Sequence, residues 1–158
     1  MTSLREEVAY AKTYIRIMSF RYKDRIHCEW RIDEELSDAA VVKMILQPIQ
    51  ENAIRHALRA GVPQVRISID IAREGETLKI AVADNGPSLS EEKLAEIRAN
   101  LERRDRGKVG LYNVNSRIKL HFGEEYGLAL TNGEAGGVTV VLTIPVNCMT
   151  PMETDTKM

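Results

Sequence analysis

The sequence is poor in the residues that hold disulfide-rich or metal-dependent proteins together. It has two cysteines, Cys28 and Cys148, which lie far apart, and three histidines. None of these residues shows a metal-ligand spacing such as CxxC or HExxH. We therefore interpret the cysteines as reduced thiols of a cytosolic protein. No secretory segment opens the chain, and no apolar run approaches the roughly 20 residues that cross a bilayer.

The sequence also lacks an excess of charge of one sign. Its 22 Lys and Arg residues balance 23 Asp and Glu residues, so nothing indicates a polyanionic partner held by bulk charge. An apolar content of 44% and a charged content of 28% are typical of a soluble globular protein. A chain of 158 residues suffices for one domain with a buried core. No repeat or linker divides it, and the polar residues 148–158 are expected to be a disordered tail.

Helical and strand periodicities follow one another along the chain. Alternating apolar residues, as in RIHCEWRID and QVRISIDIA, are typical of half-buried strands. Helices are expected at residues 3–22, 39–60, 90–104 and 111–122, and strands at residues 25–33, 64–72, 77–84, 126–132 and 137–145. Because most strands follow one another as hairpins, the sequence predicts an α+β fold. It would be a two-layer α/β sandwich, with a mixed, mostly antiparallel sheet covered by helices on one face.

The first helix carries a narrow apolar seam of coiled-coil type. Its spacing alternates between four and three residues, and it consists of Leu4, Val8, Ala11, Ile15, Met18 and Tyr22. Ser3 and Glu6 form a capping box at the start of the helix. Two interpretations are equally open: the end of a longer helix that faces a partner, or a core helix that lies on its own domain.

The segment ILQPIQENAIRHAL predicts a helix with two different faces. Asn52, Arg55, His56 and Arg59 fall on one side, and apolar residues fall on the other. An amide oxygen beside cationic groups suits a magnesium–phosphate pair. A solvated helix face is the alternative interpretation of the same stripe. Pro48 lacks an N–H group, so we expect it to kink the helix or to mark its start.

The segment LKIAVADNGPS places a carboxylate at the end of an apolar strand face. Asp84 continues the series of buried positions, and burial of a carboxylate is unfavourable unless a donor reaches it. Asn85 and Gly86 would form a tight turn that lets a flat ligand approach the backbone. Because an ionised Asp only accepts hydrogen bonds, it would prefer adenine, which offers an amino donor, over guanine. A turn without a ligand is the alternative.

A third segment, RGKVGLYNV, has two glycines that flank a loop at the start of a helix. The free N–H groups at a helix start bind anions such as phosphates. A single glycine-rich loop is a weak signal. Three such segments, each at the end of a regular element, indicate a nucleotide site more strongly.

These segments resemble the motifs of a known family. ENAIRH is similar to the N box, VADNG to the first glycine box, and VGLYNV to the second glycine box of the GHKL (Bergerat) ATPase fold. LQPIQENAIRHAL and GLYNVNSRIKLHFGEEYGL resemble more closely the catalytic domains of two-component sensor histidine kinases of the YesM/LytS type. The resemblance covers residues 4–146.

The resemblance implies an ATP-binding domain that passes the γ-phosphoryl group to a histidine on a dimerisation domain. The implied cofactors are ATP and Mg²⁺, and the implied signalling partner is a response regulator. The metal ligand would be Asn52, and Asp84 would select adenine with Gly86 behind the ring. The groups implied near the phosphates are Arg55, His56, Lys108, Gly110 and Leu111.

The sequence departs from the family pattern at several positions. Ser88 stands where the first glycine box has its second glycine, and is expected to cap the next helix with Glu91. Lys108 replaces the first glycine of the second box. Pro48 occupies the position of the catalytic glutamate of gyrase-type relatives, so efficient ATP hydrolysis is not expected and no catalytic residue is assigned.

The phosphate-accepting histidine of such kinases is not among His27, His56 and His121, because none lies in a helix-pair setting beside an acid. Residues 1–22 would then be the end of a connecting or dimerisation helix, and residues 23–147 the ATP-binding domain. The resemblance implies a cytoplasmic domain of a membrane-anchored homodimer that binds no nucleic acid. The alternatives are an anti-sigma-type serine protein kinase, a free-standing ATPase and a degenerate nucleotide-binding scaffold.

Overall fold

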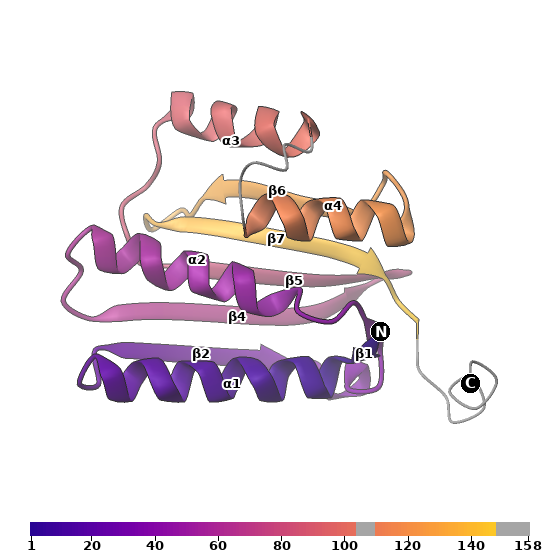
Figure 1. The fold of residues 1–158 in the computed structure, drawn as a ribbon, viewed down its shortest axis with the longest axis horizontal. Coiled ribbons are helices and arrows are strands. Elements are labelled where there is room, and N and C mark those ends of the chain that lie inside the picture. Colours follow the sequence, from indigo (N-terminus) through magenta and orange to yellow (C-terminus); the bar gives the residue numbers. More distant parts are fainter. Residues whose placement is uncertain (104–109, 148–158) are drawn as a thin grey trace.

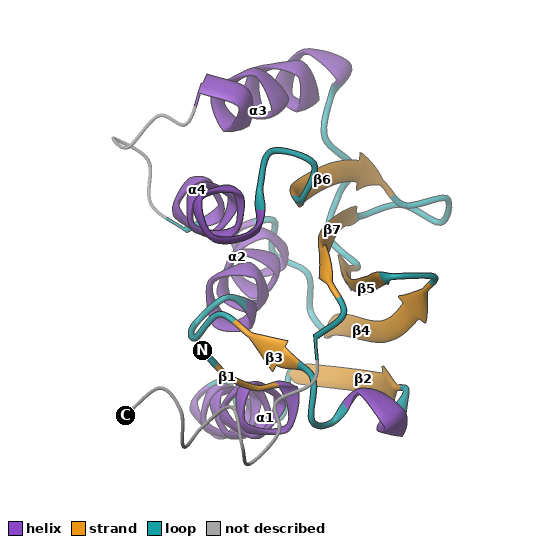
Figure 2. Cartoon of the chain, turned by 90° about the vertical axis from the view of Figure 1, so that its right-hand side faces the viewer, coloured by secondary structure: helices purple, strands orange, loops and turns teal. Residues whose placement is uncertain are grey.

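The fold is a sheet with helices packed on one of its faces (Figures 1 and 2). The computed structural model describes residues 1–103 and 110–147. Its helices are α1 (Leu4–Arg21), the short 3₁₀ helix η1 (Glu34–Leu36), α2 (Leu46–Arg59), α3 (Glu91–Arg103) and α4 (Leu111–Phe122). Its strands are β1 (Thr2–Ser3), β2 (Ile26–Ile32), β3 (Ala40–Val41), β4 (Val65–Glu74), β5 (Thr77–Asp84), β6 (Gly127–Asn132) and β7 (Val138–Pro145). Lys108, Cys148 and the expected tail lie outside the described residues.

The main sheet has five strands in the order β2-β4-β5-β7-β6. β2 runs parallel to β4, and every other neighbouring pair is antiparallel. Alternate residues of the strands are buried under the helices, as in β5, where Leu78, Ile80 and Val82 are buried and the residues between them are partly exposed. The predicted α+β sandwich with a mixed, mostly antiparallel sheet is confirmed.

α1 lies on its own domain. Ser3 caps it by accepting a hydrogen bond from the Glu6 N–H (3.3 Å). Of the predicted seam, Leu4, Val8 and Ala11 are buried in the core, and the other members pack against the core. The seam therefore contacts the domain itself, which is the second of the two interpretations of its pattern.

α2 begins later than the sequence predicts. A helix was expected from residue 39, but Ala40 and Val41 form β3, which pairs with β1. Val41 is β-branched and fits a strand well. The helix starts at Leu46, so Pro48 lies in its first turn, where a missing N–H group leaves no helical hydrogen bond unmade. The prediction for residues 39–45 was wrong, and the expectation that Pro48 marks the helix start is confirmed.

A buried carboxylate from α1 holds the start of α2. Glu7 is 4% exposed, and its two carboxylate oxygens accept from Met44 N–H (2.8 Å) and Leu46 N–H (3.3 Å). Met44 has a positive φ of 62°, a conformation that L-residues rarely adopt. From the other side, Arg117 of α4 donates to the carbonyl oxygens of Lys43 and Met44. The segment before α2 is thus held by side chains of both neighbouring helices.

Glu7→Ala is expected to destabilise the protein by about 2 kcal/mol, because it leaves two N–H donors at the start of α2 without their charged partner. Glu7→Gln keeps one acceptor oxygen and should cost about half as much. Chemical denaturation of both variants measures the difference. Equal stability of Glu7→Ala and the wild-type protein would show that water satisfies these donors.

The start of α3 also differs from prediction. Ser90, not Ser88, caps the helix, because its hydroxyl accepts from Lys93 N–H (3.1 Å). α4 begins at Leu111 and ends before Gly123, as predicted. Cys28 is a free thiol, and burial raises its pKa to about 12. Within residues 1–103 and 110–147, no helix combines the length and the apolar character needed to cross a membrane.

Candidate functional site

A cavity of about 290 Å³ opens between α2, α3, the start of α4 and the ends of β5, β6 and β7. Its volume is at the lower end of the range for small-molecule sites. Polar residues come mainly from α2, and apolar residues come from α3, α4 and the sheet. The lining residues are Asn52, Arg55, His56, Arg59, Asp84, Leu89, Lys93, Ile97, Leu111, Tyr112, Leu130 and Val138.

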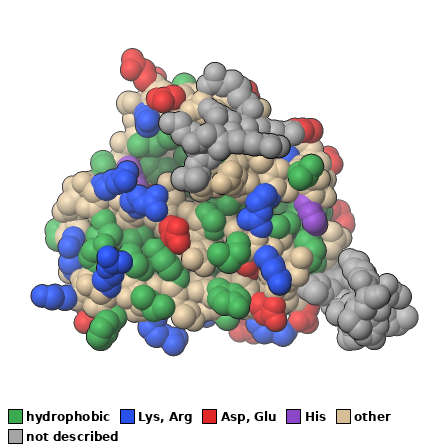
Figure 3. Space-filling model, in the orientation of Figure 1, with side chains coloured by type: hydrophobic (Ala, Val, Ile, Leu, Met, Phe, Trp, Pro, Cys, Tyr) green, Lys and Arg blue, Asp and Glu red, His purple; other side chains and the backbone are tan. Residues whose placement is uncertain are grey.

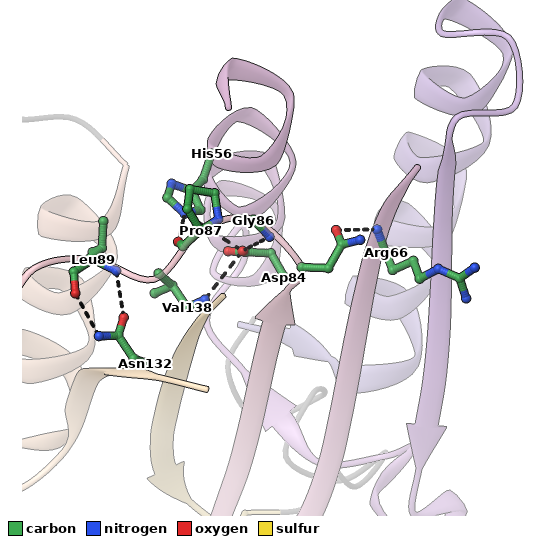
Figure 4. Close-up of polar contacts among 9 residues, drawn as sticks. His56, Arg66, Asp84, Gly86, Pro87, Leu89, Asn132 and Val138 are labelled. Atoms are coloured by element: carbon green, nitrogen blue, oxygen red, sulfur yellow. Dashed lines mark hydrogen bonds and ion pairs between the residues drawn. The ribbon is translucent and has the colours of Figure 1, made fainter. Parts of the chain in front are cut away.

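Asp84 lies at the last position of β5, where the buried face of the strand meets the cavity. Its side chain is only 3% exposed. Gly86 N–H (2.8 Å) and Val138 N–H (3.4 Å) both donate to Oδ1 (Figure 4). Among the described residues, no hydrogen bond reaches Oδ2. One carboxylate oxygen is thus fixed by the backbone, and the other is left to accept from a bound group.

The surroundings of Asp84 disfavour its charge. Burial raises the pKa of its carboxyl above the ordinary value of 3.8. The Gly86 N–H, the nearby His56 and the Val138 N–H each act in the opposite direction. A ligand that donates to this carboxylate would compensate for part of the lost hydration.

His56 lies beside Asp84 rather than at a separate end of the cavity. Its Nε2 is 2.8 Å from the Pro87 carbonyl oxygen and 3.9 Å from Asp84 Oδ1. Because a carbonyl oxygen only accepts, Nε2 carries the proton in this hydrogen bond. The imidazole thus joins α2 to the segment after β5 and positions the aspartate turn (Figure 4).

The turn after Asp84 requires glycine at position 86. A Cβ atom there would lie 2.8 Å from His56 Cδ2 and 3.1 Å from Asp84 Oδ1. Asn85 anchors the turn to the neighbouring strand: its Oδ1 accepts from Arg66 N–H, and its Nδ2 donates to the Gln64 carbonyl, each at 2.8 Å. The backbone at Gly86 therefore lies close to His56 and Asp84 on this side of the cavity.

A second asparagine holds the cavity wall. Asn132, at the end of β6, accepts from Leu89 N–H and donates to the Leu89 carbonyl, both at 2.8 Å (Figure 4). This pair fixes the segment that leads to α3. Lys93 and Ile97 of α3 then complete the wall.

The rest of the cavity carries cationic groups and one amide. Asn52, Arg55 and Arg59 line it from successive turns of α2, and Leu111 lines it from the start of α4. Gly110, just before that start, has a φ of 79°. No cluster of three metal-ligating His, Cys, Asp or Glu residues occurs in the part of the chain that the structure describes. The side-chain oxygen of Asn52 suits a magnesium ion that takes its other ligands from phosphates and water.

The cavity brings together most of the residues predicted from the sequence. Asn52, Arg55, His56, Asp84 and Leu111 line it directly. Gly86 adjoins it through its hydrogen bond to Asp84, whereas Gly110 lines a neighbouring groove. Lys108 lies outside the described residues.

Sequence reasoning assigned no site role to several residues of this region. Arg59 lies on the predicted polar stripe, and its periodicity is a signal that was available. The roles of Lys93, Tyr112 and Asn132 depend on contacts between distant segments, for which one sequence gives no signal.

Residues 37–147 match the family described as "Histidine kinase-, DNA gyrase B-, and HSP90-like ATPase". The chain belongs to this ATPase family. The GHKL resemblance of the three motifs is thereby confirmed.

Curated relatives are sensor histidine kinases. The chain is 33% identical over 145 residues to the sensor histidine kinase YesM of Bacillus subtilis (strain 168), covering 92% of the chain and 24% of YesM. It is 32% identical over 149 residues to the sensor histidine kinase YpdA of Escherichia coli (strain K12), covering 94% of the chain and 25% of YpdA. The chain thus spans about a quarter of the length of these relatives.

Solved structures confirm the fold. The catalytic domain of the histidine kinase ThkA superposes with a TM-score of 0.69 at 16% identity, covering 93% of this chain and 96% of that one. ThkA in complex with the response regulator protein TrrA superposes with a TM-score of 0.66 at 19% identity, covering 92% of this chain and 41% of that one.

Proposed function

We propose that this chain is the ATP-binding catalytic domain of a sensor histidine kinase. The observation that carries the proposal is one cavity that contains both Asp84 and Asn52. A carboxylate with a free oxygen lies in one part, and an amide beside cationic groups lies in another. A ligand with a hydrogen-bond donor at one end and phosphates at the other matches this arrangement.

The adenine ring would lie against the turn at Gly86. Its amino group would donate to Asp84 Oδ2, while Oδ1 stays bound to the backbone N–H groups. The close backbone leaves room for a flat ring, and Leu89, Ile97 and Leu130 provide apolar contacts. Guanine is disfavoured, because its oxygen at the equivalent position is an acceptor facing a carboxylate.

The phosphates would extend toward Asn52 and Leu111. Arg55 and Arg59 offset their charge, and the free N–H groups at the start of α4 donate to phosphate oxygens. Lys108 is also proposed to contact the phosphates. Bound Mg²⁺ would neutralise phosphate charge at the Asn52 side-chain oxygen.

The proposed reaction transfers the γ-phosphoryl group to a histidine of a separate helical domain. A ring nitrogen of that histidine forms a bond to the γ-phosphorus as the bond to the bridging oxygen breaks, and ADP leaves. The ring loses its other N–H proton to solvent. The phosphoryl group then passes to a response regulator. The full-length protein is proposed to be a membrane-anchored homodimer with this domain in the cytoplasm, and α1 to continue from its dimerisation helix.

Asn52→Ala is expected to remove the effect of Mg²⁺ on nucleotide binding. The variant lacks the only metal ligand proposed from the protein, so MgADP should bind about tenfold more weakly, near the affinity of ADP in EDTA. Isothermal titration with and without Mg²⁺ measures this. Asn113→Ala, at an exposed asparagine of α4 outside the cavity, is the matched control. A full Mg²⁺ effect in Asn52→Ala would exclude Asn52 as the ligand.

The residue that accepts the phosphoryl group distinguishes a histidine kinase from a serine kinase. The chain is mixed with the histidine-bearing helical domain of the same full-length kinase and with radiolabelled ATP. We expect phosphate that is labile in acid and stable in base, as for phosphohistidine. Acid-stable phosphate on a protein substrate would instead indicate a serine kinase. No thermal shift with any adenine nucleotide would indicate a scaffold.

A further inference from the structure

Met44, two residues before α2, has a strained backbone conformation. Its φ of 62° lies in the left-handed region, which is unfavourable for a residue with a Cβ atom and persists only where the surroundings hold it. Burial of the side chain does not provide that hold, because Met44 is 46% exposed. On the helical face of the molecule, hydrophobic side chains are interspersed with Lys and Arg side chains (Figure 3). The conformation of Met44 must therefore be held through its backbone.

Two side chains of opposite charge hold the polar backbone groups of Met44. The Met44 N–H donates to Glu7 Oε1 of α1 (2.8 Å), and the Met44 carbonyl oxygen accepts from Arg117 Nη1 of α4 (3.0 Å). Arg117 also donates to the Lys43 carbonyl oxygen. Glu7 is only 4% exposed, and hydrogen bonds to charged groups are stronger than neutral ones. We call Glu7, Met44 and Arg117 together the Met44 clamp.

The Met44 clamp joins the two helices that carry the proposed phosphate end of the site. α2 and α4 lie side by side and run in opposite directions (Figures 1 and 2). Asn52 lies six residues after Leu46 at the start of α2, and Arg117 lies six residues after Leu111 at the start of α4. Six residues span about 9 Å of an α-helix. The clamp therefore holds the same pair of helices about 9 Å from the place where Asn52 and Leu111 line the cavity.

We propose that Glu7 and Arg117 are positioning residues for the phosphate end of the nucleotide site. By holding Met44 in its strained conformation, they fix the start of α2 relative to α4, and so place Asn52 relative to the N–H groups at the start of α4. The inference rests on the proposed function and adds the residues that set the spacing of its metal and phosphate contacts. Because Glu7 belongs to α1, a shift of α1 would change the affinity for phosphates without a change at Asp84.

Release of the clamp is expected to weaken the binding of phosphates but not of adenine. In Arg117→Ala, Met44 relaxes to an ordinary φ in most molecules, and the apparent affinity falls with the fraction that keeps the strained conformation. MgADP should bind at least about tenfold more weakly than to wild type, in keeping with the size of such strain. Adenosine, which lacks phosphates, should bind within about twofold of wild type. Titration with both ligands measures the ratio of affinities. An unchanged ratio would overturn the proposal.

A second substitution distinguishes positioning from general loosening of the fold. Glycine adopts a left-handed conformation without strain, so Met44→Gly in the Arg117→Ala background should recover MgADP affinity at least about fivefold. Met44→Ala in the same background is the matched control, because it removes the same side chain but keeps the strain, and it should recover nothing. Equal MgADP affinities of the two double variants would show that the strain at Met44 plays no part.

The wild-type protein provides a test that does not depend on the folding of any variant. If the clamp and the phosphate end are coupled, bound phosphates must stabilise the clamp in return. Hydrogen exchange of the Met44 and Leu46 N–H groups, which donate to Glu7, should slow at least about fivefold with saturating MgADP and less than about twofold with saturating adenosine. Equal effects of the two ligands would contradict the proposal and leave the proposed function standing. If the wild-type protein binds no adenine nucleotide, the proposed function itself fails.

Discussion

Asp84→Asn is expected to weaken nucleotide binding by about 100-fold or more while leaving the fold at least as stable as the wild type at neutral pH. The two effects separate because the two carboxylate oxygens have different partners. Oδ1 accepts from the Gly86 and Val138 N–H groups, and the carbonyl oxygen of a carboxamide can replace it. The amide nitrogen then takes the place of Oδ2 and presents a donor to the cavity.

A donor at that position opposes the adenine amino group. Loss of a hydrogen bond to a charged acceptor costs about 2–3 kcal/mol, which is on the order of a 100-fold loss of affinity. The donor–donor contact adds to this loss. Titration with MgADP, and the thermal shift that MgADP causes, measure the effect. If the variant still binds MgADP with an affinity within a few-fold of wild type, Asp84 does not accept a hydrogen bond from the adenine amino group.

The stability of the nucleotide-free protein gives an independent check with a defined sign. Because burial raises the pKa of Asp84 above 3.8, the folded state binds this proton more tightly than the unfolded state. The stability contributed by the protonated carboxyl is complete below the unfolded pKa and is lost as the pH rises through the folded pKa. A carboxamide does not titrate there. The melting temperature of Asp84→Asn relative to wild type should therefore increase from about pH 4 upward and then level off.

The parts of this protein that sequence could predict are those with local signals. The alternation of apolar and polar residues predicted β4 and β5. Gly123, which follows the apolar positions of α4, predicted where that helix ends. Asp84 was found because a carboxylate at the end of an apolar strand face is unusual wherever it occurs. The position of Asn52 on the polar face of α2 followed from helical periodicity.

The parts that sequence could not predict depend on distant segments. Residues 39–45 continue an apolar pattern that a helix would also show, but β1 and Glu7 give their backbone groups other partners. Ser88 and Ser90 are both plausible caps, and only the path of the chain decides between them. Asn132 reads as an ordinary turn residue at the end of β6, yet it holds Leu89 across the cavity wall. This role depends on hydrogen bonds between Asn132 and Leu89, which are far apart in the sequence.

Gly137→Ala is expected to give the largest loss of stability among the substitutions considered. Gly137 precedes β7 in a segment whose sequence predicts only a glycine-rich turn, and its φ is 78°. A Cβ atom there would lie 2.0 Å from the Asp84 carbonyl oxygen, a separation that real Cβ atoms do not show. The strained backbone costs about 1–2 kcal/mol, and the overlap should raise the total to about 4 kcal/mol or more. Chemical denaturation measures the loss.

Gly136→Ala is the matched control, because Gly136 also has a positive φ, of 97°, but a Cβ atom there would meet nothing within 4 Å. It should show the backbone strain alone, about 1–2 kcal/mol. The difference between the two variants therefore measures the overlap with Asp84. Equal losses would mean that β5 and β7 move apart at little cost. We expect the larger loss for Gly137→Ala, together with weaker MgADP binding by the molecules that remain folded. Both effects have the same cause, because the added Cβ atom displaces the backbone that positions Asp84.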